Sequence, residues 1–249
     1  MIWVIARHEL GAMFLSPLAW VILAVVQFIL GYMFLANLDN FFILQPQLSH
    51  LANTPGVTDL VVAPLMQVAA IILLMVMPLV TMRSLAEEKR NGTLSLLVSS
   101  PLTMTDIVLG KYLGLLLFIV ILVSLLMLMP LSLYLGTNPD GGKLLSIFLG
   151  MLLLPGAFAA IGLYLSSLTE NQTIAAVSTF GALLMLWIVD WIGATLENGQ
   201  SILTYLSMLQ HHRSMLEGVF DTGDLAYYLI LICGFLVLTI RQLERERLL

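Results

Sequence analysis

Six stretches of this sequence are apolar over lengths that match, or nearly match, the thickness of a lipid bilayer. A helix needs about twenty residues to cross the hydrocarbon core, with about seventeen as the lower limit. Five of the stretches meet this limit, and the last falls just short of it. The stretches cover residues 17–36, 60–81, 112–129, 144–165, 174–194 and 225–240. We therefore predict one all-α integral membrane domain over residues 1–249, with six transmembrane helices.

The composition excludes an ordinary soluble protein. Hydrophobic residues make up 60% of the chain and charged residues only 10%, whereas charged residues reach about a quarter of a soluble domain. The chain has a single cysteine, Cys233, so it has no intrachain disulfide. No basic patch is large enough to indicate nucleic-acid binding.

The positions of the basic residues predict the orientation in the membrane. If the N-terminus is cytoplasmic, eight of the ten Lys and Arg residues face the cytoplasm, and only Lys143 and Arg213 lie outside. The positive-inside rule then places both termini in the cytoplasm. An even number of spans agrees with this placement.

Residues 1–15, before the first predicted span, have the pattern of an amphipathic helix. One face carries apolar side chains, namely Ile2, Trp3, Ala6, Leu10, Met13 and Phe14. A helix of this kind lies in the headgroup plane of the membrane. Ser16-Pro17 separates it from the first span, because proline is tolerated in a first helical turn.

Residues 195–224, between the last two predicted spans, contain two short apolar-faced helices that cannot span the membrane. We expect Ser201 to cap the first, Ser214 and Glu217 to form a capping box in the second, and Asp224 to cap the sixth span. The segment is predicted to form a re-entrant or interfacial hairpin on the outer side. The adjacent pair His211-His212 is expected either to be exposed or to pack within the loop, because neighbouring helical residues point about 100° apart and rarely bind one metal.

The charged segment 83–110, between the second and third predicted spans, holds three successive helix signals. Arg83–Arg90 continues the second span, and Asn91-Gly92 ends it. Leu94, Leu97 and Val98 then share one side of a short helix that starts after Thr93 and stops at Ser100-Pro101. Thr103 and Asp106 have capping-box spacing at the start of the helix that enters the third span.

A solvated loop has no need of this leucine cluster or of these capping signals in sequence. We therefore predict a short apolar-faced helix held below the membrane between two longer helices. Such an element can press into a groove on a soluble partner.

Residues for catalysis, nucleotide binding or metal binding are not assigned in this chain. Gly136–Leu144 resembles a phosphate-binding loop, but its spacing is wrong by one residue and the Ser or Thr after the lysine is missing. His8-Glu9 begins a zinc-protease pattern, but Ala12 stands where the second histidine is required. All four histidines lie outside the predicted spans, which disfavours an intramembrane enzyme.

Asp190 is the unusual polar residue of the fifth predicted span, near its outer end between Trp187 and Trp191. A carboxylate at the membrane centre costs about 2.5–3.5 kcal/mol, and less near the interface. Two interpretations stay open: a polar residue of a transport pathway or helix bundle, or a solvated interfacial residue beside two anchoring tryptophans.

Three parts of the segment 83–110 resemble the cytoplasmic segment of ABC-2-type transporter permeases, and in particular the gliding-motility-type permeases. They are Glu87–Leu94, Ser99–Thr103 and Gly110-Lys111. Gly218–Tyr228 also resembles that subgroup, and the resemblance covers nearly the whole chain.

The resemblance implies an elbow helix at 1–15, a coupling helix within 83–110 and an outer re-entrant hairpin before the sixth span. It also implies two permease subunits, in a homo- or heterodimer, paired with two ATP-binding subunits that carry the ATP and magnesium. A role in coupling to the ATPase then falls on Glu87, Glu88, Gly92, Thr93, Leu94, Leu96, Leu97 and Pro101.

From these observations we predict the permease subunit of an ATP-driven ABC-2-type exporter in a bacterial inner membrane, with no cofactor in this chain. A periplasmic or membrane-anchored accessory protein is a further expected partner. The alternative is a mechanotransmission subunit, which passes ATPase-driven motion to a periplasmic partner without moving a substrate. The lack of polar residues in the predicted spans favours this alternative, or a lipid-like passenger, over a hydrophilic solute.

Overall fold

The computed structural model describes residues 1–48, 56–93, 103–137, 139–195 and 207–248, and over these ranges the chain is helical and contains no strands. The elements are α1 (Ile2–Leu15), α2 (Pro17–Leu48), the π-helical turn η1 (Thr58–Val62), α3 (Ala63–Thr81), α4 (Ala86–Arg90), α6 (Met104–Ser132), the 3₁₀ turn η2 (Leu133–Leu135), α7 (Gly141–Ser167), α8 (Gln172–Thr195), α10 (Met208–Leu216) and α11 (Thr222–Leu248).

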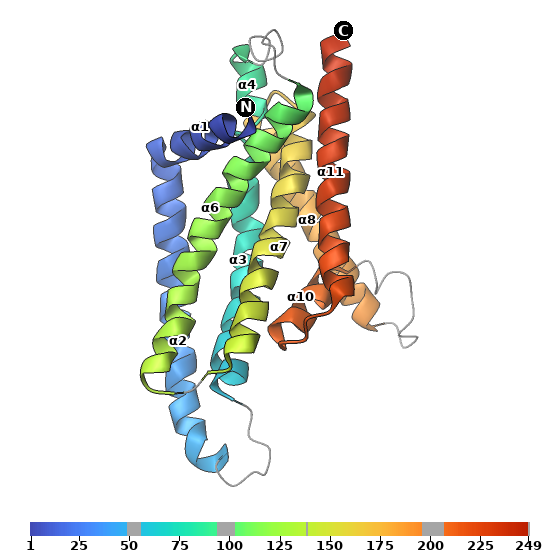
Figure 1. Ribbon diagram of the computed structural model, residues 1–249. Helices are drawn as coiled ribbons and strands as arrows, with labels where there is room; N and C mark the ends of the chain where they lie inside the picture. The colour runs from blue at the N-terminus through green and yellow to red at the C-terminus, as the bar shows by residue number, and fades with distance from the viewer. Residues whose placement is uncertain (49–55, 94–102, 138, 196–206, 249) are drawn as a thin grey trace.

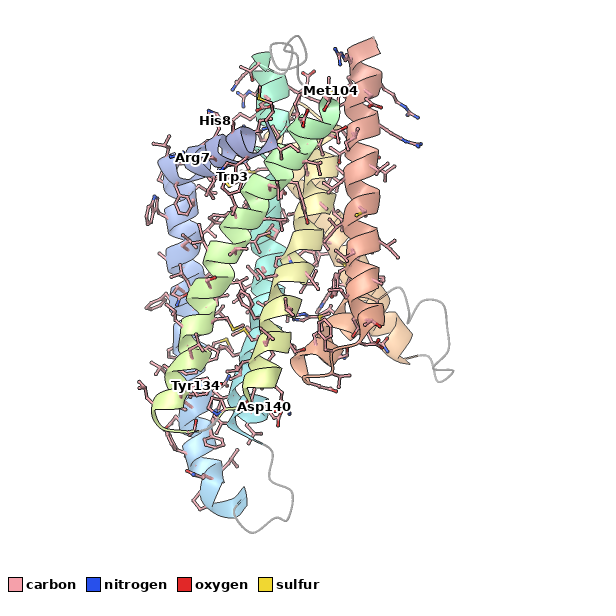
Figure 2. All side chains as sticks on the ribbon, viewed as in Figure 1. Trp3, Arg7, His8, Met104, Tyr134 and Asp140 are labelled. Atoms are coloured by element: carbon pink, nitrogen blue, oxygen red, sulfur yellow. The ribbon has the colours of Figure 1, made fainter. Side chains whose placement is uncertain are left out.

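The long helices run side by side along one axis, and α1 lies across one end of them (Figure 1). Both termini and α4 lie at this same end, which we call the α1 end. Figure 2 places His8 and Met104 at the α1 end, and Tyr134 and Asp140 at the opposite end. The polar side chains of α1 and α4 are thus gathered at one end of an apolar bundle.

Five helices of the described residues are long and apolar enough to cross a membrane. They cover Pro17–Pro46, Thr58–Arg90, Met104–Leu135, Gly141–Ser167 and Thr222–Arg247. Each contains one of the predicted spans, so five of the six predictions are confirmed as apolar helices of membrane length. The remaining prediction, 174–194, falls on α8, whose described apolar part is the shorter Gln172–Ile188.

Helices α2 and α11 are clearly longer than the hydropathy pattern predicts. α2 continues past Ala36 to Leu48, because no glycine or proline interrupts residues 37–45 and Phe41 is buried in the core at 8% exposure. α11 begins at Thr222 and ends at Leu248, so the short apolar range 225–240 is the middle of a longer helix. Hydropathy marks the apolar part of a helix and misses its polar ends.

α7 is the central helix of the bundle and packs against α3, α6, α8, α10 and α11. Its contact with α3 requires a glycine, since a Cβ atom at Gly162 would lie 2.2 Å from Thr81 Oγ1. α1 approaches α6 as closely, because Cβ atoms at Gly110 and Gly114 would lie 2.6 Å and 2.7 Å from the Cβ atoms of Ile5 and Glu9. These glycines let the backbones come into direct contact.

The predicted apolar face of the first helix is only partly correct. Ala6 is fully buried against the bundle, but Trp3 is 64% exposed, and Glu9 faces α6 instead. The face that packs against α6 therefore includes small and charged side chains, because the glycines of α6 leave room for them.

Candidate functional site

The predicted continuation of the second span through Arg83–Arg90 is interrupted, because a turn at residues 82–85 separates α3 from α4. The end of α7 holds this turn. The Oγ atom of Ser166 accepts hydrogen bonds from the backbone N–H groups of Leu85 and Ala86, at 3.2 and 3.0 Å. The same hydroxyl lies 3.2 Å from the carbonyl of Met82, to which it donates. One buried side chain thus satisfies three backbone groups that the interrupted helix leaves without partners.

Lys111 of α6 joins three elements at the α1 end. Its Nζ atom lies 3.0 Å from Glu9 Oε2 in α1 and 2.7 Å from Glu88 Oε1 in α4, and its side chain is only 3% exposed. The second oxygen of Glu9 accepts a hydrogen bond of 3.0 Å from Ser84 Oγ. Burial of a cation is costly, and two carboxylates with a hydroxyl donor compensate for it here.

Lys89, the neighbour of Glu88, joins α4 to the opposite side of the bundle. Its ammonium pairs with Glu246 of α11 at 2.5 Å and also donates to the carbonyl of Ser167 in α7. Adjacent residues on a helix point about 100° apart, so Glu88 and Lys89 bind different neighbours.

α4 is therefore bound on two faces to α6, α7 and α11, and Lys111 links it indirectly to α1. Residues 94–102, which follow it in the sequence, connect to α6 at the capping box of Thr103 and Asp106, which the structure confirms. The predicted helix end is confirmed as well: Asn91 caps α4, and Gly92 has a φ of +69°, the left-handed region that favours glycine.

The structure describes four of the eight residues predicted to couple to an ATPase. Glu87 and Glu88 lie in the first turn of α4, and Gly92 lies just beyond its C-cap. The hydroxyl of Thr93 donates to the carbonyl of Glu88 at 3.3 Å. The others, Leu94, Leu96, Leu97 and Pro101, lie outside the described residues. Asp190 falls in α8, and its side chain is outside the described part.

A second polar cluster lies between α10 and the start of α11. Asp224 Oδ1 lies 2.5 Å from His211 Nδ1, and the other oxygen of the carboxylate accepts from Ser214 Oγ. The ring of His211 also stacks on Tyr227 at 4.3 Å. Asp224 and Ser214 are therefore parts of one inter-helix network rather than the helix caps predicted for them. The N-cap of α10 is Ser207, whereas Ser201 lies outside the described residues.

His212 packs on the other side of α10, against α7. It is fully buried, and neither ring nitrogen has a hydrogen-bond partner among the residues that the structure describes. Burial lowers the pKa of His212 from 6.5 to about 4, so its ring is neutral at physiological pH. Near it, Ser146 Oγ donates to the carbonyl of Met215 at 2.9 Å, which fixes α10 to the second turn of α7.

Several residues of the α1 end were missed in the sequence. Glu9, Ser84, Ser166 and Glu246 each make their contacts across long sequence separations, so no local spacing reveals them. The one available signal was a carboxylate, Glu9, within an otherwise apolar-faced helix.

A family model described as ABC-2 family transporter protein matches residues 3–248, which is nearly the whole chain. A search of curated proteins found no match. The family match agrees with an apolar bundle of membrane-length helices and with a polar α1 end. The chain belongs to the ABC-2 transporter family and is a multi-pass membrane protein, the permease subunit of an ABC transporter.

Proposed function

We propose that this chain is the permease subunit of an ATP-driven exporter of the gliding-motility type, and that it works as a dimer with separate ATP-binding subunits. In this proposal it crosses the bacterial inner membrane six times, with α8 as the fifth span and the α1 end in the cytoplasm. α1 is the elbow helix, residues 94–102 contain the coupling helix, and α10 belongs to the outer re-entrant hairpin. The family membership and the positions of the basic residues support this arrangement.

The observation that carries the proposal is the attachment of α4 to α6, α7 and α11, with α1 joined to the same group through Lys111. A partner that closes on ATP would displace residues 94–102, and α4 and α6 flank these residues on either side. The ion pairs of Glu88 and Lys89 would then transmit the displacement to α1, α6 and α11. No nucleotide chemistry is required of this chain, because the partner supplies it.

The test is a substitution at the predicted contact with the ATPase. We expect Leu97→Asp to abolish most of the ATP hydrolysis that the permease stimulates in the ATP-binding subunit purified with it, because a carboxylate would enter an apolar contact. Membrane insertion and dimer formation should be unchanged. The matched control is Leu168→Asp, at an exposed leucine between α7 and α8. Normal stimulation in the Leu97 variant would contradict the coupling assignment.

A mechanical function is the second candidate, and the apolar character of the helices favours it. The buried polar residues of the long helices are mostly Ser and Thr, several of which bond to a carbonyl of their own helix, as Thr81, Thr179 and Thr239 do. Such an interior offers little to a hydrophilic solute. A crosslink that closes the dimer interface should stop an exporter, whereas ATP-dependent work on a periplasmic partner would persist in a mechanotransmitter.

A further inference from the structure

A cavity of about 420 Å³ opens beside α4, between α1, the start of α2, the end of α3 and α6. Ligand pockets have volumes of about 300–1,000 Å³, so this one is large enough for a small headgroup. Its two ends differ in chemistry. One end is lined by His8, Glu9, Arg83, Glu87, Glu88 and Lys111, and the other by Met13, Leu18, Leu79, Val80 and Phe118.

Some charged side chains at the polar end have no partner of opposite charge among the described residues. Glu9, Lys111 and Glu88 form one group with a net charge of −1. Arg83 is exposed and makes its described contact with a neutral group, Ser16 Oγ, at 3.2 Å. Glu87 also lines the cavity, and the described residues offer it no ion pair. Within the described part of the chain, the wall therefore presents a cation without an ion-pair partner and an anionic surface to the same space.

The apolar end of the cavity opens toward the surface that a membrane would cover. Leu79 at this end is 43% exposed, and Leu15, which also lines the cavity, is 88% exposed. In a chain of this class, exposed leucines beside a membrane-spanning helix face acyl chains. A molecule bound here would have a charged part at the level of α1 and α4 and an apolar part that leaves the cavity past α3.

We propose that this cavity binds the headgroup of a phospholipid that carries both a phosphate and a primary amine. Arg83 would bind the phosphate, and Glu87 with the Glu9–Lys111–Glu88 group would bind the ammonium, while the acyl chains pass Leu79 into the leaflet. The headgroup chemistry is independent of the transport proposal. Only the leaflet, the cytoplasmic one, rests on the orientation proposed above.

A lipid bound in this cavity would help to hold α4 against the bundle. Its headgroup would touch α1, α4 and the turn between α3 and α4 at once. Lys111 already joins α1 to α4, and Ser84 of that turn donates to Glu9 of α1. The bound lipid would therefore form part of the joint between α4 and the bundle.

The experiment measures lipid retention by the full-length chain, without any ATPase, so that its failure is distinct from failure of the transport proposal. The purified protein is titrated in detergent with phosphatidylethanolamine, phosphatidylglycerol and phosphatidylcholine of identical acyl chains, and bound lipid is counted by native mass spectrometry. We expect retention of phosphatidylethanolamine over both others. Free phosphoethanolamine, which lacks acyl chains, should not compete at equal concentration.

Three variants locate the site. Arg83→Gln and Glu87→Gln should each weaken retention of phosphatidylethanolamine about fivefold, the effect of one partly exposed charged contact. Ala12→Trp should also reduce retention, since Ala12 lines the cavity on the exposed side of α1 and a large ring there would occupy the space. The matched controls are Arg245→Gln and Glu170→Gln, at exposed positions away from the cavity.

Preference for phosphatidylglycerol would overturn the proposal, because it would show that the carboxylates of the cavity do not select a lipid with an ammonium group. Equal retention of all three lipids, or unchanged retention in the three cavity variants, would overturn it as well. Competition by free phosphoethanolamine would show a soluble ligand in place of a lipid. Each variant is first checked for a monodisperse peak and an unchanged melting temperature, and Ala12→Trp leaves every charge of the site in place.

Discussion

Lys111 shows how a single buried charge can be tolerated at the end of an apolar bundle. Its ammonium has two carboxylates within 3.0 Å. Removing the cation would leave Glu9 and Glu88 as like charges in a partly desolvated space. The cost of removing one partner of a buried pair exceeds the net contribution of the pair itself.

We therefore expect Lys111→Met to lower the free energy of unfolding by about 3–5 kcal/mol. The measurement is unfolding in detergent, by denaturant or heat, with the wild-type protein alongside.

The matched control is Lys143→Met at the opposite end of the bundle. Lys143 pairs with Asp59 at 2.9 Å, but its side chain is 30% exposed, so the loss should be only about 0–1 kcal/mol. Equal losses of unfolding free energy in the two variants would mean that burial of the Lys111 ion pairs does not increase their contribution to stability.

At the scale of elements, the contact between α3 and α7 depends on one missing side chain. We expect Gly162→Ala to destabilise the protein by about 1–3 kcal/mol, because the new Cβ would lie 2.2 Å from Thr81 Oγ1 and the helices must separate. Hydrogen exchange of residues 82–90 should rise, since Ser166, one turn further along α7, holds that turn.

The control for this substitution is Gly181→Ala in α8, where no atom lies within 4 Å of the added Cβ. It should be neutral or slightly stabilising, because alanine favours a helix over glycine by about 1 kcal/mol. Similar destabilisation by both substitutions would point to helix propensity and away from the contact with Thr81.

The packing of α10 against α7 should depend on pH through His212. Its pKa is about 4 in the folded protein, against 6.5 ordinarily. Between these values the unfolded chain binds a proton that the folded protein does not, so stability falls as pH is lowered from about 6.5 to 4. The total loss is about 3 kcal/mol, from 1.36 kcal/mol per pKa unit.

His212→Leu should remove this part of the pH dependence, since leucine fills the buried site without a titratable group. Melting temperatures measured between pH 4 and pH 7 would show a flatter profile for the variant than for the wild type. His8→Gln, at an exposed histidine of α1, should keep the wild-type profile. An unchanged slope in the His212 variant would assign the effect to another group.

The elements themselves were largely predictable from the sequence, because hydropathy and capping act locally. The apolar centres of the long helices, the Thr103–Asp106 box and the glycine end of α4 all follow from neighbouring residues. The caps predicted for α10 and α11 failed because Ser214 and Asp224 bond to each other across the two helices. Glu9, Lys111 and Glu246 were equally hidden, since their pairing depends on how distant helices pack.

At the scale of the whole molecule, orientation can be tested with the chain's single cysteine. In a Cys233→Ser background, we expect Asn91→Cys to react with a membrane-impermeant maleimide only from the cytoplasmic side, because Asn91 is exposed at the α1 end. Gly136→Cys, at the opposite end in open space, should react only from the periplasmic side. The measurement uses right-side-out and inverted vesicles, and the reverse result would invert the proposed topology.

The attachment of α4 on two faces suggests where an inhibitor of this permease subunit should bind. Among the described residues, α4 is bound to α6, α7 and α11, and Lys111 joins α1 to the same group, so we expect these helices to move together. If the proposed dimer forms, each copy should move as one rigid body, and the relative motion should occur at the interface between the two copies. An effective inhibitor would then be a molecule that binds at this interface and prevents the two copies from moving relative to each other.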